Sequence, residues 1–270
     1  MKAALLLLAL VAGVPAPATA RVDPNVLLQA KADFVKAKVD FIKGIFHPKP
    51  PTPPPSPSPS PPPGPTCPPP GFDSAAGFDL AAYVSAPWYP LQQMPIIYQP
   101  ANQLYCVRAV YTPKDPANLA AGIKVLNTAN EGSVTGPPIS SDSNPAASLQ
   151  AVPAGGAGPT AASKLLVGPA FLPASLYGPY WVVAFAPDYS WAIVSGGAPT
   201  QTLPGGCATL ANSVNNSGFW LFSRKPEDAA ALAEMRSVAA GLGYDLSVLQ
   251  DVAHAGCTYP PAPAAKTAGH

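Results

Sequence analysis

The residues that could catalyse a reaction are few in this chain of 270 residues, and they lie far apart in the sequence. The three histidines are His47, His254 and His270, which fall in a proline-rich segment, near the C-terminus and at the last position. No catalytic triad and no metal-ligand cluster can be recognised around them. The motifs G-x-S-x-G, G-x-x-x-x-G-K-S/T and G-x-G-x-x-G after a strand are absent as well. We therefore expect no enzyme activity, no catalytic residue, no metal site and no cofactor.

Cysteine is the residue type whose number does indicate covalent chemistry. Cys67, Cys106, Cys207 and Cys257 are even in number and widely spaced, and no C-x-x-C pair with zinc-ligand spacing occurs. In an oxidising compartment this pattern predicts two disulfides, for which spacing alone allows three connectivities. A sequon at Asn215 (N-N-S) predicts N-glycosylation there, unless this short match is unused.

The first twenty residues indicate an oxidising destination. Lys2 is followed by an apolar run over residues 3–14 and by A-T-A at residues 18–20. This is the pattern of a secretory signal peptide over residues 1–20, cleaved after residue 20. Twelve apolar residues span about 18 Å of helix, against about 30 Å for a hydrocarbon core, which disfavours the alternative of an uncleaved anchor. We expect a secreted or extracellular protein, with plastid-lumen or vacuolar delivery as the alternative.

An amphipathic helix is predicted over residues 21–47. Asp23 is a suitable N-cap, Pro24 suits the first turn, and apolar residues at helical spacing fall mostly on one broad face. The stretch 23–46 can contact a membrane or lipid-particle surface, pack on the rest of the protein, or pair with its own copy. The sequence leaves these alternatives, and the oligomeric state, open.

A proline-rich arm follows over residues 48–66. Fifteen of the 39 prolines lie between residues 48 and 70, so this segment cannot be a packed core. Polyproline II geometry gives the arm a length of about 60 Å. Its Ser-Pro and Pro-Pro runs resemble the hydroxyproline-rich, O-glycosylated modules of plant and green-algal cell walls, with an unmodified linker as the alternative.

The composition of the remainder is that of a globular domain. The chain has 48% hydrophobic and only 11% charged residues, with a net charge of +1. A nucleic-acid-binding protein would normally show a strong basic excess, so we expect no nucleic-acid partner.

Residues 67–260 are predicted to fold, with a disordered tail over residues 261–270. Short runs rich in aromatic and β-branched residues recur between Gly, Pro and Asn turns, which predicts strands. One helix is predicted from Pro226 to Gly241, with acidic residues in its first turn and glycine at its end. Such an order predicts an all-β barrel or sandwich. The predicted strands are residues 88–93, 104–111, 122–128, 164–167, 179–186, 190–195 and 218–223.

The segments CPPPGFDS, APWYPLQQMP, QLYCVRAVYT, GPYWVVAFAPDYSWAIVSG and GFWLFSRKP, with the closing helix, run in the order found in one known family. The chain resembles the lipocalins, most nearly the group of apolipoprotein D-like, bacterial and plant members. The resemblance covers residues 67–260 and leaves the N-terminal helix and the arm out. It implies an eight-stranded antiparallel up-and-down barrel with one C-terminal α-helix. Residues 132–163 are longer and richer in Ala, Gly and Pro than the family pattern, so one strand there is uncertain.

Four matched positions are implied to have structural roles. Trp88 matches the first family tryptophan, Asp188-Tyr189 match a turn motif, and Arg224 matches the arginine after the last strand. Trp88 would plug the closed end of the barrel, and Arg224 would cross over its ring. Matched positions also select among the connectivities, since they imply the bridges Cys67–Cys207 and Cys106–Cys257. The chain departs from the family at Ala86, Pro87 and Pro187.

By the same resemblance, Tyr111, Tyr180 and Trp220 occupy positions that contact ligand. Strand alternation places Tyr111 with Ala109 and Val107, Tyr180 with Val182 and Ala184, and Trp220 with Phe222. Large rings with a polar tip suit a sterol, retinoid, carotenoid or fatty-acyl group, although the same rings can simply fill a core. Residues 94–98 would form a loop at the mouth, where exposed apolar side chains can contact membranes or lipoproteins.

The predicted function is therefore that of a secreted lipocalin that binds or transports a small hydrophobic ligand. One alternative is a passive cell-wall or surface module without an open cavity. A less favoured alternative is a lipocalin-fold enzyme that modifies carotenoids.

Overall fold

The computed structural model describes residues 64–143 and 148–261. The predicted signal peptide, the amphipathic helix, nearly all of the proline-rich arm and the C-terminal tail lie outside the described residues. Two α-helices, α2 and α3, are present in the described part. The helices are α2 (Leu80–Val84) and α3 (Ala229–Gly241), with 3-10 turns at Ala101–Gln103, Leu119–Ala121, Ala161–Ser163, Ala174–Leu176 and Leu246–Val248.

The strands account for most of the remaining regular structure. They are β1 (Tyr89–Gln93), β2 (Tyr105–Pro113), β3 (Ile123–Asn130), β4 (Pro138–Ser140), β5 (Leu149–Pro153), β6 (Lys164–Pro169), β7 (Gly178–Phe185), β8 (Trp191–Ser195), β9 (Gln201–Leu203), β10 (Gly206–Ala208), β11 (Phe219–Ser223) and β12 (Gln250–Asp251). All seven predicted strands are observed. The strand left uncertain between residues 132 and 163 is β5, and the short strands β4, β9, β10 and β12 were not predicted.

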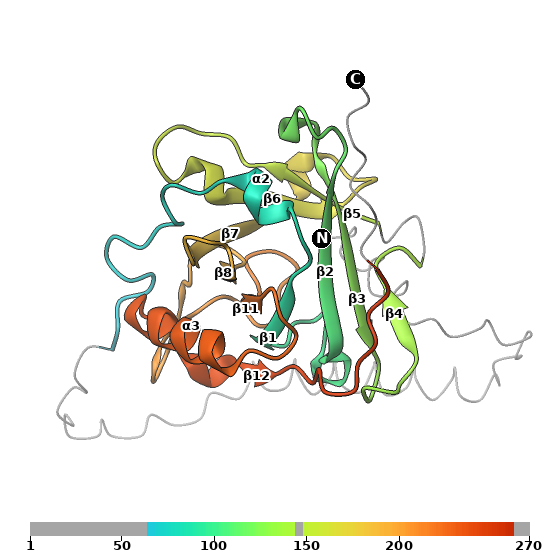
Figure 1. Cartoon of the computed structure of the whole chain (residues 1–270). Helices are drawn as coiled ribbons and strands as arrows, with labels where there is room; N and C mark the ends of the chain where they lie inside the picture. Colours follow the sequence, from blue (N-terminus) through green and yellow to red (C-terminus); the bar gives the residue numbers. More distant parts are fainter. Residues whose placement is uncertain (1–63, 144–147, 262–270) are drawn as a thin grey trace, which may run out of the picture. The chain divides into compact units, whose positions relative to one another are not determined.

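The main sheet follows an up-and-down order around a ring (Figure 1). Its order is β12-β1-β11-β8-β7-β6-β5-β3-β2, and every neighbouring pair is antiparallel. Two main-chain hydrogen bonds between Trp88 and Ala109, each 2.9 Å long, join the start of β1 to β2. These bonds bring β1 next to β2, the last strand of the order, and leave the two-residue strand β12 as an extension beside β1. The fold class expected from the sequence, an antiparallel barrel with one main C-terminal helix, is therefore confirmed.

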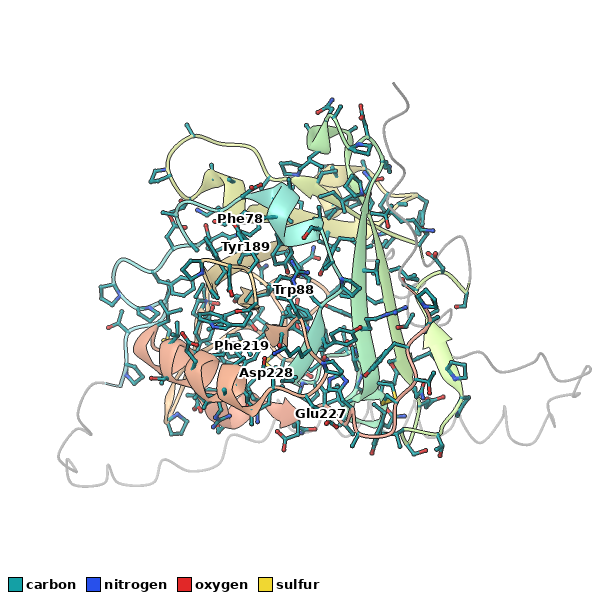
Figure 2. The ribbon with its side chains drawn as sticks, in the orientation of Figure 1. Phe78, Trp88, Tyr189, Phe219, Glu227 and Asp228 are labelled. Atoms are coloured by element: carbon teal, nitrogen blue, oxygen red, sulfur yellow. A yellow bond between two sulfur atoms is a disulfide. The ribbon has the colours of Figure 1, made fainter. Side chains whose placement is uncertain are left out.

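Alternation of side chains separates an inner and an outer face of this sheet. The inner face holds a cluster around Tyr111, Val182 and Phe222. On the outer face, Ile193 and Leu221 pack with Met235 of α3, which is fully buried. Figure 1 shows α3 lying beside β8 and β11, and Figure 2 shows Phe219 on the side of this helix.

Two details differ from the sequence prediction. Helix α3 begins at Ala229 and not at Pro226, because Asp228 has a non-helical backbone (φ −155°, ψ 80°) and its carboxylate accepts a hydrogen bond from the main-chain N–H of Ala231 (3.1 Å). A bulge in β7 pairs Ala184 with Ile193 on the outer face. Ala184 therefore does not share a face with Tyr180 and Val182, since the extra residue reverses the alternation.

Two disulfides are present, Cys67–Cys207 and Cys106–Cys257, and these are the pairs that the resemblance implies. Cys67 joins the start of the described chain to β10. Cys257 joins the C-terminal segment to Cys106, the second residue of β2. Cys106 has a positive φ of 52° and lies at an irregular point of the β2–β3 pairing.

Because the strands alternate in direction, their connections gather at two ends. The closed end consists of residues 114–122, 154–163 and 186–190 together with α2. The open end consists of the connections 94–104, 131–137, 170–177 and 196–218. Within the described residues, no helix is long and apolar enough to cross a membrane.

Candidate functional site

The closed end is built around Trp88, which is fully buried directly before β1. Its indole N–H donates a hydrogen bond to the carbonyl of Tyr83 (2.9 Å), which ties α2 to the sheet. The guanidinium carbon of Arg224 lies 3.5 Å from the centre of the Trp88 ring, so cation and ring are stacked as the resemblance implies. Arg224 also donates hydrogen bonds to main-chain carbonyls of Ala82, Tyr83, Ala86, Pro87 and Tyr189.

This environment has an electrostatic consequence for Arg224. Burial lowers its pKa to about 10, which still leaves the guanidinium charged at neutral pH. A charged group with this many carbonyl partners holds α2, the turn before β1 and the β7–β8 turn in one arrangement. Its geometry is that of a structural residue.

Asp188 and Tyr189 form the tight turn between β7 and β8. Hydrogen bonds from Ser190, first from its hydroxyl and then from its main-chain N–H (2.9 Å), lower the pKa of the Asp188 carboxylate. Tyr189 has a positive φ of 56°, and its hydroxyl accepts a hydrogen bond from the Asp79 N–H (2.6 Å). Figure 2 shows Tyr189 close to Phe78 above Trp88. The turn therefore anchors the start of α2 at the closed end.

The closed end around Trp88 forms the floor of the barrel. Inside the barrel, next to this floor, three tyrosine hydroxyls meet. The Tyr180 hydroxyl lies 2.6 Å from that of Tyr83 and 2.7 Å from that of Tyr111. Burial raises the pKa of Tyr111 to about 12 and raises those of Tyr83 and Tyr180 well above the ordinary value, so all three are neutral at physiological pH. Each of the three hydroxyls lies within hydrogen-bonding distance of another, so each can donate or accept within the trio.

Trp220 and Gln93 lie nearer the open end. The Trp220 ring stacks on Tyr180 with centres 6.3 Å apart, and both side chains are only half-buried. Gln93 is directly opposite Trp220 in the β1–β11 pairing, which places the two side chains on the same face. Gln93 is fully buried; its amide N–H donates to Gln99, and its side-chain oxygen has no hydrogen-bond partner among the described residues.

The barrel interior is free of charge in the part of the chain that the structure describes. Two charged residues, Arg108 and Asp245, are buried in the described part of the chain. Both side chains face away from the barrel interior. Arg108 donates to the carbonyl of Pro260 in the C-terminal segment, and Asp245 accepts from the N–H groups of Gly205 and Ser247. Across residues 64–143 and 148–261, no group of three or more His, Cys, Asp or Glu residues is arranged to hold a metal ion.

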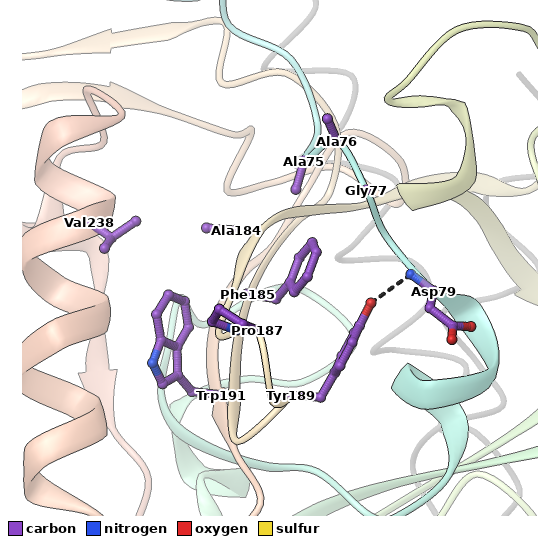
Figure 3. Close-up of a pocket in the computed structure, with 10 residues that line it drawn as sticks. All are labelled: Ala75, Ala76, Gly77, Asp79, Ala184, Phe185, Pro187, Tyr189, Trp191 and Val238. Atoms are coloured by element: carbon purple, nitrogen blue, oxygen red, sulfur yellow. Dashed lines mark hydrogen bonds between the residues drawn. The ribbon is translucent and has the colours of Figure 1, made fainter.

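Two hollows lie outside the barrel. The larger, with a volume of about 620 Å³, is bounded by the segment before α2, the β7–β8 turn and α3. In Figure 3 the rings of Phe185, Tyr189 and Trp191 line it, with the Asp79–Tyr189 hydrogen bond at its edge. The smaller, of about 350 Å³, surrounds Arg224 at the closed end. Neither hollow includes a residue that the sequence predicted to contact ligand.

The structure brings the three predicted ligand residues into one connected cluster. Tyr111, Tyr180 and Trp220 are linked by a hydroxyl contact and a ring stack, whereas Asn215 lies apart, half-buried in the β10–β11 connection. Sequence reasoning missed Tyr83, because α2 lies outside the strand pattern. It also missed Gln93, although a glutamine next to the apolar run Met94-Pro95-Ile96-Ile97 was a visible signal.

Comparisons with known proteins give structural likenesses only. No family model matches the chain, and no curated protein matches it. Lobster apocrustacyanin A1 matches with 15% identity and a TM-score of 0.42, over 65% of this chain and 79% of that one. Apocrustacyanin C2 matches with 15% identity and a TM-score of 0.42, over 64% and 78%. Insecticyanin from the tobacco hornworm Manduca sexta matches with 15% identity and a TM-score of 0.46, over 73% and 91%.

Proposed function

We propose that the protein is a lipocalin-type carrier, secreted from the cell, whose barrel binds a small hydrophobic molecule by non-covalent contacts. The observation that carries the proposal is the half-buried pair Tyr180 and Trp220, whose stacked rings face the interior on the open side of a buried aromatic floor. Such rings offer a flat apolar surface together with a polar tip. The motif match to the lipocalins, and within them to the apolipoprotein D-like group, supports the same conclusion.

The polar groups of the interior restrict the class of ligand. A carboxylate placed among neutral tyrosines would have no cationic partner, and burying an unpaired charge is costly. The trio instead presents neutral hydroxyls, which can donate or accept a hydrogen bond, and the Gln93 oxygen offers one acceptor. We propose an uncharged ligand with one or two oxygen atoms, of the sterol, retinol or carotenoid type, in preference to an ionised fatty acid.

Delivery outside the cell is supported by the predicted signal peptide and by the two disulfides, since both belong to an oxidising route. N-glycosylation at Asn215 stays a prediction of the sequon. The arm over residues 48–66 and the helix over residues 21–47 are proposed to tether or space the barrel from a surface.

The test is a titration of the secreted protein with retinol and, separately, with palmitate. Retinol binding is measured by the fluorescence of the ligand, and palmitate binding by its competition with retinol. We expect retinol to bind and ionised palmitate to bind at least about tenfold more weakly, a difference of about 1.4 kcal/mol. Trp220→Ala should weaken retinol binding by at least about tenfold. Trp181→Phe is the matched control, because Trp181 lies one residue from Tyr180 on the outer face, with the Lys164 ammonium 4.6 Å from its ring centre.

Three outcomes would contradict the proposal. Absence of binding to any apolar ligand would favour the passive surface module. Equal weakening by both variants would place the ligand outside the barrel. Recovery of a chemically altered ligand would favour the enzyme alternative.

A further inference from the structure

The open end carries an unusual concentration of exposed apolar side chains. Every large hydrophobic residue that is clearly exposed in the described part of the chain lies in one of three connections at this end. Their exposed fractions run from 39% to 59%. We name this set the apolar rim: Ile97, Tyr98, Phe171, Leu176, Leu210 and Val214.

Main-chain hydrogen bonds hold the rim residues on compact turns. Residues 96 and 99 exchange two hydrogen bonds (3.1 and 3.0 Å), which puts Ile97 and Tyr98 at the tip of a turn. The Leu210 N–H donates to the carbonyl of residue 216 (2.8 Å), closing a loop that carries Val214. Leu176 ends a 3-10 turn. The side chains are therefore presented outward by ordered backbone, so little conformational entropy remains to be lost when they bind.

Contacts between the connections show that they belong to one surface. The N–H of Gly132 donates to the carbonyl of Asn102 (2.7 Å). The Thr209 hydroxyl lies 3.9 Å from the Met94 sulfur, which joins the β1–β2 connection to the β10–β11 connection. The β6–β7 connection adjoins the same region, because a Cβ at Gly178 would lie 2.6 Å from the Asn215 side-chain oxygen.

The surface around the rim has almost no charge. The connections 94–104, 170–177 and 196–218 contain no Asp, Glu, Lys, Arg or His. Glu131 is the one charged residue in the fourth connection, over residues 131–137. A surface without charge complements neither an anionic membrane nor a charged protein, but it matches lipid headgroups without net charge.

We propose that the apolar rim docks on the surface of a bilayer whose headgroups are zwitterionic or uncharged. Ile97, Phe171 and Leu176 would enter the boundary between headgroups and acyl chains, and the Tyr98 ring would sit at headgroup level. In this orientation the open end faces the bilayer, so a ligand exchanges between membrane and barrel without crossing water. This last step rests on the proposed function, whereas docking itself does not require a ligand.

The test is flotation of the chain with vesicles of pure phosphatidylcholine, in 0.1 M and 0.5 M NaCl. The protein is produced without N-glycosylation, because a glycan at Asn215 would stand beside Val214 on the same loop. We expect it to float with the vesicles to the same extent at both salt concentrations, since no charge pairs are involved. The double variant Ile97→Ser/Phe171→Ser should lower the vesicle-bound to free ratio at least tenfold. Leu119→Ser, in a closed-end connection, is the matched control and should leave this ratio unchanged.

Several results would overturn the docking proposal. An unchanged ratio in the double variant would assign binding to another part of the chain, such as residues 23–46. Binding only to vesicles with anionic lipid, or binding lost in 0.5 M NaCl, would show an electrostatic site. A dimer in sedimentation equilibrium that the double variant dissociates would assign the rim to a second copy of this chain.

The same samples separate docking from ligand binding. If the wild type binds retinol in solution but not the vesicles, docking is wrong and the proposed function stands. If it binds the vesicles but no apolar ligand, docking stands and the proposed function is wrong. The double variant should bind retinol in solution as the wild type does.

Discussion

The two ends of the barrel are stabilised by different means. At the closed end a half-buried arginine, a fully buried tryptophan and a short helix are joined by hydrogen bonds to main-chain carbonyls. At the open end the connections are long and nearly uncharged, and both disulfides attach chain segments there: Cys67–Cys207 at β10 and Cys106–Cys257 at the start of β2. Hydrogen bonds and a cation–π contact therefore stabilise the closed end, whereas disulfides stabilise the open end, through which a ligand is proposed to exchange.

This difference has a physical reason. Apolar side chains exposed on loops cannot hold those loops together, because they make few contacts with one another. A disulfide stabilises such a loop without covering its surface. An arginine that donates to several carbonyls stabilises the segments around it and also occupies the space between them. This arrangement closes that end of the barrel to a ligand.

The largest expected effect is at the open end. Replacing Cys106 and Cys257 by serine should lower the free energy of unfolding by about 3–5 kcal/mol, because the bridge closes a loop of 151 residues. Urea denaturation of the variant and the wild type, both under non-reducing conditions, measures this loss. A loss below about 1 kcal/mol would show that the open end does not depend on its covalent bonds.

The corresponding change at the closed end is Arg224→Met, which keeps an unbranched apolar stem but removes the charge and the hydrogen-bond donors. The carbonyls around it lose their partner, and we expect a loss of about 3 kcal/mol in the free energy of unfolding. Lys225→Met is the matched control, since Lys225 is exposed, and it should change stability by less than about 0.5 kcal/mol. Equal effects of the two variants would contradict the role given to Arg224.

Between the two ends, the tyrosine trio should contribute less. Tyr83→Phe removes one hydroxyl contact from a fully buried site and should cost about 1 kcal/mol of stability. Tyr98→Phe, on the exposed rim, should cost less than about 0.5 kcal/mol. Chemical denaturation curves of both variants measure the two losses of stability. A larger loss of stability in Tyr98→Phe than in Tyr83→Phe would contradict the assignment of Tyr83 to the buried interior and of Tyr98 to the exposed rim.

The sequence predicted these features unequally. Trp88, Arg224 and the cysteine pairs could be identified because the resemblance fixes them at single positions that pack in one way. The face of Ala184 could not be predicted, because a bulge depends on how two strands pair and leaves no mark in alternation. Tyr83 and Gln93 join the interior through α2 and through a bulge in β1, both of which are results of tertiary packing. The apolar rim was foreseen only for residues 94–98, since exposure elsewhere depends on loop conformation.

The smallest expected effect is a pH dependence at His254, on the outer side of β1. Its ring contacts the Tyr259 hydroxyl and the Pro90 carbonyl, and burial lowers its pKa in the folded protein. The unfolded chain therefore takes up the proton first, so stability should fall as pH decreases from about 7 to about 5.5. Urea midpoints at the two pH values measure this slope, which His254→Gln should flatten.

Two features isolate the contribution of His254 in this measurement. His47 and His270 are replaced by glutamine in both proteins, so that no other histidine titrates in the window. The pKa values of Asp73, Asp188 and Asp245 are lowered by hydrogen bonds, so the stability from these groups is lost only below about pH 4. An unchanged slope in the glutamine variant would contradict the buried neutral state of His254.

The most direct test of the central claim is a crystal structure of the protein with retinol bound. The account predicts ligand density inside the barrel, against the rings of Tyr180 and Trp220, with its hydroxyl near the tyrosine trio or Gln93. Density in the hollow lined by Phe185, Tyr189 and Trp191, with the interior unchanged, would contradict it.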